Sequence, residues 1–208
     1  MKKIIIISIL SLVASVSLAN NEIYLEQEGT TGTFNITQIG SSNRIGQSTD
    51  ISTIKGNDSV FNISQLGNSN ALDITYDGKE TTFDLYIEGD GNTQDLVVDG
   101  DGNDFDNVIL GNNNALTVSK DPTSDEASSI SDQTFSNYII GDSNTLDFYI
   151  DSNVNATIDI TVAGSSNDIT SIQEGGNLGI GHNQKLELQG SGNTIDLVQS
   201  GSEAQTLE

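Results

Sequence analysis

The residues from Gly56 to Gly111 read GNDSVFNISQL GNSNALDITYD GKETTFDLYIE GDGNTQDLVVD GDGNDFDNVIL G, five units of 11 residues that each begin with glycine. In the third unit, apolar side chains alternate with other residues at Phe83, Leu85 and Ile87. A period of two is typical of a strand that buries one face. The glycine at each junction suits a bend because it tolerates positive φ. Each unit therefore predicts one short strand followed by one tight turn.

The same frame continues on both sides of this stretch, with jumps in phase that predict longer turns. The repeat glycines are Gly29, Gly40, Gly56, Gly67, Gly78, Gly89, Gly100, Gly111, Gly141, Gly164, Gly175, Gly190 and Gly201. Asparagine usually stands three residues after the glycine, at Asn43, Asn70, Asn92, Asn103, Asn114, Asn144, Asn167 and Asn193. Glutamine stands two residues before the glycine at Gln27, Gln38, Gln65, Gln173 and Gln199. The longest insertion, residues 120–133, is an acidic loop rich in Asp and Ser that holds the only proline, Pro122.

Two units form a strand, a bend, a second strand and a second bend in 22 residues, which is one rung of a β-solenoid. We therefore expect an all-β protein of about seven rungs with parallel stacked strands, spanning residues 20–208. Equivalent side chains then form ladders at about 4.8 Å, in which Gln and Asn can bond amide to amide. The expected core residues are Phe34, Ile36, Phe61, Ile63, Ile74, Phe83, Leu85 and Leu96. An 11-residue helical repeat would need apolar residues at steps of three and four, which this pattern lacks.

The N-terminal segment has the features of a secretory signal. Lys2 and Lys3 precede the apolar run 4–13, and Ser17 and Ala19 are small residues spaced two apart. We expect a signal peptide over residues 1–19 that is cleaved after Ala19. Because the apolar run is shorter than the roughly 20 residues that a spanning helix needs, no membrane insertion is expected. The sequence predicts a secreted protein.

The composition excludes several classes of function. The chain has 208 residues, seven Lys and Arg against 30 Asp and Glu, and a formal net charge of −23. Such a surface repels phosphate backbones, so no nucleic-acid partner is expected. The absence of Cys excludes disulfides, zinc ribbons and thiol nucleophiles, and one histidine, His182, excludes a multi-histidine metal site. We expect no enzyme activity, and we interpret His182 as a loop residue.

The segments Gln38–Asn43 and Gln65–Asn70 follow the frame Gln-x-Gly-x-x-Asn. This frame resembles the curlin repeat of bacterial curli fibre subunits, and the resemblance covers about residues 23–201. It implies a subunit that self-assembles head to tail into extracellular functional amyloid at the cell surface. It further implies roles in biofilm matrix, adhesion and surface colonisation, with other curlin-like subunits or a nucleator as partners. No residue would be catalytic, and no cofactor is implied.

Aspartate recurs on the outward side of the predicted strands, at Asp73, Asp84, Asp95, Asp106, Asp159 and Asp196. Residues 22 apart should stack, which places Asp73 over Asp95, Asp84 over Asp106 and Asp77 over Asp99. Stacked carboxylates repel one another, so we expect acid or Ca²⁺ to speed assembly. The alternative interpretation is a solvated acidic face that keeps the chain soluble.

A second functional class stays open, namely a monomeric β-solenoid that binds a partner or adheres along one face, with or without a cation. Residues 99–104 resemble a calcium loop, but Leu110 occupies the twelfth position, where such a loop carries Glu. The weak candidate cofactor is therefore Ca²⁺ on stacked surface carboxylates, and no dedicated metal site is expected.

Overall fold

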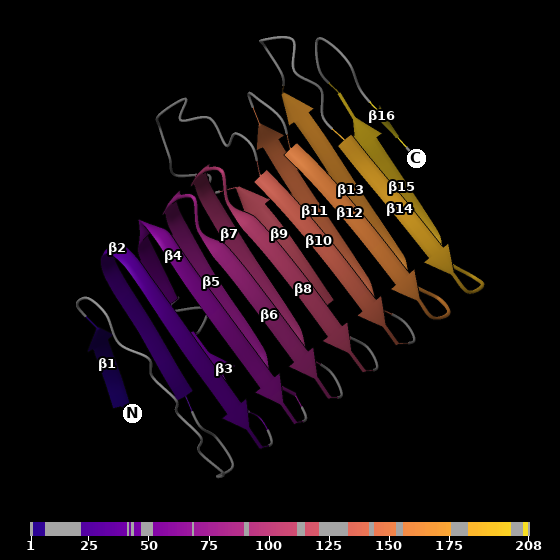
Figure 1. Cartoon of the computed structure of the whole chain (residues 1–208). Helices are drawn as coiled ribbons and strands as arrows, with labels where there is room; N and C mark the ends of the chain where they lie inside the picture. Colours follow the sequence, from indigo (N-terminus) through magenta and orange to yellow (C-terminus); the bar gives the residue numbers. More distant parts are fainter. Residues whose placement is uncertain are drawn as a thin grey trace.

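The computed structural model describes residues 2–6, 22–40, 42, 44–46, 52–67, 69–89, 92–111, 115–120, 133–141, 144–152, 156–175, 183–200 and 206–207. Every element in these ranges is a β-strand, and the strands stack side by side along one axis (Figure 1). All their pairings are parallel, which confirms the predicted β-solenoid.

The strands form two faces. Face A contains residues 32–39 of β2 (Glu22–Ile39) and residues 59–66 of β4 (Ser52–Leu66), then β6 (Thr82–Glu88), β8 (Asp104–Leu110), β10 (Gln133–Ile140), β12 (Ala156–Ala163), β14 (Asn183–Gln189) and β16 (Thr206–Leu207). Face B contains the first parts of β2 and β4, with β3 (Arg44–Ile45), β5 (Ala71–Lys79), β7 (Thr93–Asp101), β9 (Ala115–Lys120), β11 (Thr145–Ser152), β13 (Asp168–Gly175) and β15 (Thr194–Gln199). β1 (Lys2–Ile6) pairs with the first part of β2. Because β2 and β4 turn the corner without a break, the two faces are continuous.

Register lines run along the whole stack. On face A one line joins Phe34, Phe61, Phe83, Phe105, Phe135, Ile158 and Gln184. Its six steps are 27, 22, 22, 30, 23 and 26 residues long, so the stack has about six full turns. The prediction of seven rungs is slightly too high, because the corners take residues beyond the 22 of the basic rung.

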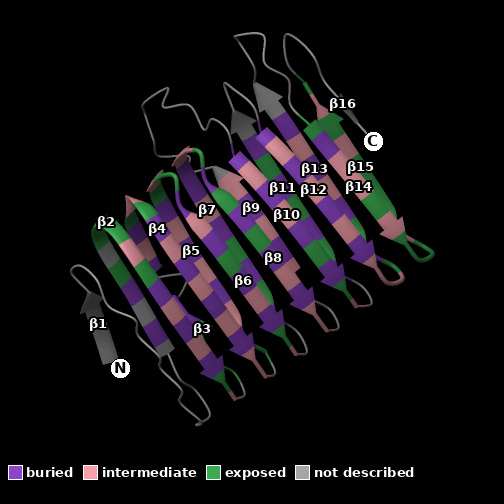
Figure 2. Cartoon of the chain, in the orientation of Figure 1, coloured by how far each residue is buried: buried purple, intermediate pink, exposed green. Residues whose placement is uncertain are grey.

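The core lies between the two faces. Burial alternates along the strands, so that every second side chain points inward (Figure 2). The predicted core residues Phe34, Ile36, Phe61, Ile63, Ile74, Phe83, Leu85 and Leu96 are all buried. The two faces touch directly, since the rings of Tyr76 on β5 and Phe83 on β6 meet edge to face with centroids 4.9 Å apart.

Five phenylalanines form a stacked column in this core. Phe34, Phe61, Phe83, Phe105 and Phe135 lie on one register line with neighbouring ring centroids 4.6, 4.9, 4.7 and 5.0 Å apart. The rings are nearly parallel because the strand spacing is close to the thickness that stacked rings prefer. The column helps to fix the register of face A, since a slip of any one strand by one residue would turn its ring to solvent.

Candidate functional site

The asparagines at the corners link one rung to the next. Asn70 Nδ2 donates to the carbonyl of Gly67, three residues earlier, at 2.8 Å, and the Asn70 amide N–H donates to Asn92 Oδ1 at 3.0 Å. Asn92 Nδ2 in turn bonds the Gly89 carbonyl at 3.0 Å. With the spacing Gly-x-x-Asn, one asparagine side chain can therefore donate to the glycine carbonyl of its own turn and accept from a backbone N–H of the neighbouring rung.

The same arrangement recurs further along the stack. Asn144 donates from Nδ2 to the Gly141 carbonyl and from its N–H to Asn167 Oδ1. Asn167 in turn donates to Asn193 Oδ1 from both its N–H and its Nδ2 atom, at 3.0 and 3.2 Å. At the opposite corner the Asn103 side chain accepts from the Thr81 N–H and donates to the Gly78 carbonyl. The expected amide-to-amide ladder of asparagines is therefore mostly a side chain-to-backbone ladder, because the turn leaves backbone groups that need partners.

The glutamines form pairs at the two ends of the stack. Gln65 Nε2 donates to Gln38 Oε1 at 2.9 Å on face A, and Gln199 Nε2 donates to Gln173 Oε1 at 3.2 Å on face B. Between these pairs the inward position holds apolar residues such as Ile87. Gln27 lies in β2 opposite Ile54, but its side chain, Asn43, Asn114 and Gly201 lie outside the described residues.

A second set of buried amides was missed by the repeat analysis. Gln94 Nε2 on β7 donates to Asn107 Oδ1 on β8 at 2.9 Å, and Asn107 Nδ2 donates to Asn137 Oδ1 on β10 at 2.8 Å. Gln184 on β14 donates in the same way to the Ser171 hydroxyl on β13. The alternation of inward and outward residues along the strands places Gln94 and Asn107 at inward positions, so the sequence pattern alone could have identified them as buried amides. The Gln94–Asn107 bond ties face B to face A in the middle of the stack, and the Gln184–Ser171 bond does so near its C-terminal end.

The repeat glycines allow close approach at the corners. In the column Gly40, Gly67, Gly89, Gly111, Gly141, Gly164 and Gly190, each N–H up to Gly164 bonds the carbonyl that precedes the next glycine. A Cβ on Gly89 would lie 1.8 Å from the Gly67 carbonyl oxygen, and its φ is +138°. No other residue fits this position without displacing the neighbouring strand.

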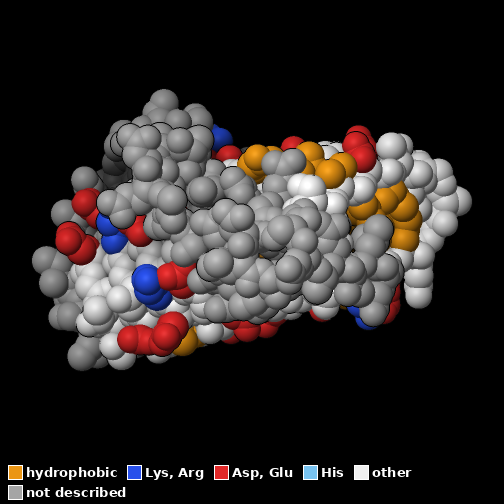
Figure 3. Space-filling view, turned by 90° about the horizontal axis from the view of Figure 1, so that it is seen from above, with side chains coloured by type: hydrophobic (Ala, Val, Ile, Leu, Met, Phe, Trp, Pro, Cys, Tyr) orange, Lys and Arg blue, Asp and Glu red, His pale blue; other side chains and the backbone are white. Residues whose placement is uncertain are grey.

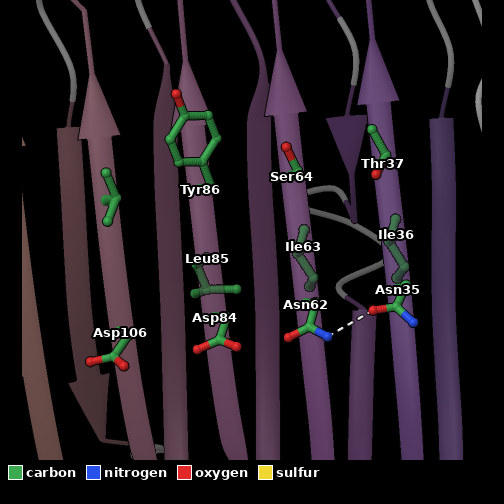
Figure 4. A pocket seen from close by; sticks show the side chains of 11 residues that line it. Asn35, Ile36, Thr37, Asn62, Ile63, Ser64, Asp84, Leu85, Tyr86 and Asp106 are labelled. Carbon is green, nitrogen blue, oxygen red and sulfur yellow. Dashed lines mark hydrogen bonds between the residues drawn. The ribbon is translucent and has the colours of Figure 1, made fainter.

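The outer surface of face A carries two rows of side chains that run along the solenoid axis (Figure 4). One row holds Asn35, Asn62, Asp84 and Asp106, and the other holds Thr37, Ser64, Tyr86 and Val108. The rows border a trough of about 330 Å³ that crosses β2, β4, β6 and β8. Asn62 Nδ2 donates to Asn35 Oδ1 at 2.7 Å, and Tyr86 Oη donates to Glu88 Oε2 at 2.8 Å.

The predicted carboxylate stacks lie in register. Asp73 pairs with Asp95 and Asp77 with Asp99 on face B, while Asp84 pairs with Asp106 on face A. Burial raises the pKa of Asp73, the neighbouring Asp95 raises it further, and Arg44 opposes both effects. Burial also raises the pKa of Asp95. Burial of both side chains, and for Asp73 also the charge of Asp95, therefore favours the protonated forms of this pair.

A further carboxylate, Asp104, lies at the start of β8 near Asp84 and Asp106. Burial raises the pKa of Asp104, and the charges of Asp106 and Asp84 raise it further. Negative charge is therefore concentrated beside the trough, where β6 and β8 lie next to each other.

Two ion pairs lie near the corner that holds Gly56, Gly78 and Gly100. Lys79 Nζ lies 2.6 Å from Asp101 Oδ2, and Lys55 Nζ lies 3.5 Å from Asp77 Oδ2. In the view of Figure 3, the basic side chains lie beside acidic ones. Asp99 is buried, and its Oδ1 atom has no hydrogen-bond partner. Within the described ranges, no group of three or more His, Cys, Asp or Glu side chains could hold a metal ion.

Comparison with known proteins identifies no relative, since no protein-family model, curated protein or solved structure matches the chain. The part of the chain that the structure describes contains no helix that is long and apolar enough to cross a membrane. His182, residues 7–20 and most of the acidic insertion lie outside the described residues.

Proposed function

We propose that this protein is a secreted structural subunit that self-assembles head to tail into extracellular, curli-like amyloid fibres. The observation that carries this proposal is the parallel register that continues through the whole stack. β15 is the last strand of face B, and residues 32–39 of β2 begin face A. A strand at the end of a sheet presents N–H and C=O groups that can pair with another chain.

The geometry supports an open assembly. The two ends of the solenoid differ in sequence, so contact between the end of one copy and the start of the next is heterologous and builds a filament. The ends also carry matching side chains, since Ile195, Leu197 and Gln199 of β15 repeat the spacing of Ile23, Leu25 and Gln27 in β2. Such a contact would continue both the apolar columns and the glutamine pairs. Export to the cell surface and a part in biofilm matrix and adhesion belong to the same proposal.

A second candidate is a capped monomer that binds a partner along one face. One observation favours it: the short strand β16 pairs with β14 and covers part of one end of face A, as the caps of repeat proteins do. β1 also pairs with the first part of β2, but it lies within residues 1–19, the segment expected to be removed as a signal peptide.

Dilution of residues 20–208 from denaturant separates the two candidates. Thioflavin fluorescence and electron microscopy should show a lag followed by growth of unbranched fibrils, and preformed fibrils of the same protein should remove the lag. Sonicated fibrils of an unrelated protein are the control and should leave the lag unchanged. A folded, β-rich monomer that stays monomeric for days would favour the capped module instead.

A further inference from the structure

The trough on face A has the chemistry of a binding site for a linear polymer. It runs along the solenoid axis, so every strand that it crosses presents one residue of each bordering row (Figure 4). Neighbouring parallel strands are about 4.8 Å apart. That spacing is close to the length of one hexose unit in an extended β-linked sugar chain. Each strand that the trough crosses can therefore contact one sugar of such a chain.

Aromatic rings lie on the same register line at a matching interval. Tyr86, Val108 and Tyr138 are register partners on β6, β8 and β10, and Tyr138 is 46% exposed. Two rings two strands apart are separated by about 10 Å, the length of one disaccharide. The C–H face of a pyranose packs on an aromatic ring, and a tyrosine face also attracts a cation. The hydrogen bond from Tyr86 to Glu88 leaves the Tyr86 ring beside the trough.

Charge selects the kind of sugar. Asp84 and Asp106 lie on the opposite row, and the ion pairs within the described ranges engage Asp77, Asp101 and Glu187 instead. Two adjacent carboxylates on one row together attract an ammonium group of a sugar chain that lies between the rows. On the same row, the Asn62–Asn35 bond leaves Asn62 Oδ1 as an acceptor for hydroxyl or ammonium groups. The site thus favours a cationic ligand over a neutral or acidic one.

We propose that this trough binds an extended, positively charged polysaccharide, a β-linked polymer of amino sugars, with one sugar per strand. The inference goes beyond fibre formation. The trough lies on the side of the solenoid and not at its ends, so a monomer and a fibre would both display it. Along a fibre the sites would recur once per subunit and bind one long chain at many points.

The test uses the full chain and three probes: a β-1,4-linked glucosamine hexamer, its fully N-acetylated counterpart and hexalysine. Affinities are measured by calorimetry at about pH 5.5, where ordinary carboxylates are ionised. The glucosamine hexamer should bind at least tenfold more tightly than either other probe, and salt should weaken that binding. Equal binding of hexalysine would show that charge alone attracts the ligand, and equal binding of the acetylated hexamer would show that charge is irrelevant. Either result overturns the proposal.

Variants locate the site. Tyr86→Ala and the double variant Asp84→Asn/Asp106→Asn should each lower the affinity for the glucosamine hexamer about tenfold. Tyr86→Phe keeps the ring and should keep most of the affinity, which separates stacking from the hydrogen bond to Glu88. Tyr149→Ala is the matched control, because Tyr149 is 42% exposed on β11 of face B. An equal loss in the control, or no loss in Tyr86→Ala, overturns the assignment to face A.

Discussion

The side-chain amide of Gln65 donates to the side-chain oxygen of Gln38 on the neighbouring strand, Nε2 to Oε1, at 2.9 Å. The Gln65 Oε1 atom is buried and has no hydrogen-bond partner. The reason is the next residue on the same register line, Ile87, which has no donor. The glutamine ladder on face A thus ends after two members, and its last acceptor is left unsatisfied.

This arrangement predicts strong coupling between the two glutamines. Gln38→Leu and Gln65→Leu should each destabilise the protein, because each removes one partner of a buried bond. The double variant should be more stable than the sum of the single effects predicts, by about 1 kcal/mol, because the single variants each lose the same shared bond and leave its other partner buried without it. Urea denaturation of the monomer measures the three free energies of unfolding. Additive effects would contradict the ladder.

The glycine column predicts a position that tolerates no side chain. Gly89→Ala places a Cβ 1.8 Å from the Gly67 carbonyl oxygen, so it should destabilise the protein by more than about 4 kcal/mol. Gly102→Ala is the control, because its φ is +65° and its nearest neighbour would be Glu80 Cγ at 3.6 Å. The control should lose only about 1 kcal/mol, the cost of a left-handed conformation. Thermal unfolding followed by circular dichroism compares them, and equal losses would refute the close approach.

The phenylalanine column predicts a large effect at its centre. Phe83 is fully buried and stacks on Phe61 and Phe105 with centroids 4.9 and 4.7 Å apart. Phe83→Ala should cost about 3–5 kcal/mol of unfolding free energy, and Phe83→Leu should cost less because it fills most of the space. Tyr138→Ala, on the exposed side of β10, should change stability by no more than about 0.5 kcal/mol. A small loss for Phe83→Ala would mean that the column does not hold face A together.

The carboxylate pair Asp73 and Asp95 predicts a stability that rises on acidification. Both have folded-state pKa values above the ordinary aspartate value of 3.8, because burial disfavours the charged form. The folded state therefore binds these protons more tightly than the unfolded state does. The resulting stabilisation is fully present below pH 3.8 and is lost as the pH rises through the folded pKa values.

The double variant Asp73→Asn/Asp95→Asn isolates this effect from the net charge of the chain. Its urea midpoint should change less between about pH 3 and pH 7 than that of the unaltered protein, since the two titrations are gone. If the two proteins have the same pH dependence, or if stability rises with pH, the pair does not act in this way.

Much of the architecture follows from residue spacing. The alternation around Phe83 predicts which side chains are buried, and the 22-residue step predicts that Asp73 lies over Asp95. These results need only the period of a strand and the length of a rung. The burial pattern does not depend on the corners, whereas Asp73 lies over Asp95 only because that rung has no extra corner residue.

Other features depend on details that spacing does not contain. Asn107 and Asn137 bond although they are 30 residues apart, because the acidic insertion lengthens that step. The trough depends on the height of side chains such as Tyr86 above the sheet, which a pattern of apolar residues does not describe.

The unequal steps along face A have a practical consequence. The step from Phe105 to Phe135 takes 30 residues, whereas the steps before and after it take 22 and 23, and the two rings still stack with centroids 5.0 Å apart. The corner between β9 and β10 therefore accommodates additional chain length while the pitch of the solenoid is preserved. An engineer could insert a peptide epitope, an enzyme tag or a dye-binding sequence there. In a fibre, such cargo would be displayed at regular intervals, one copy per subunit.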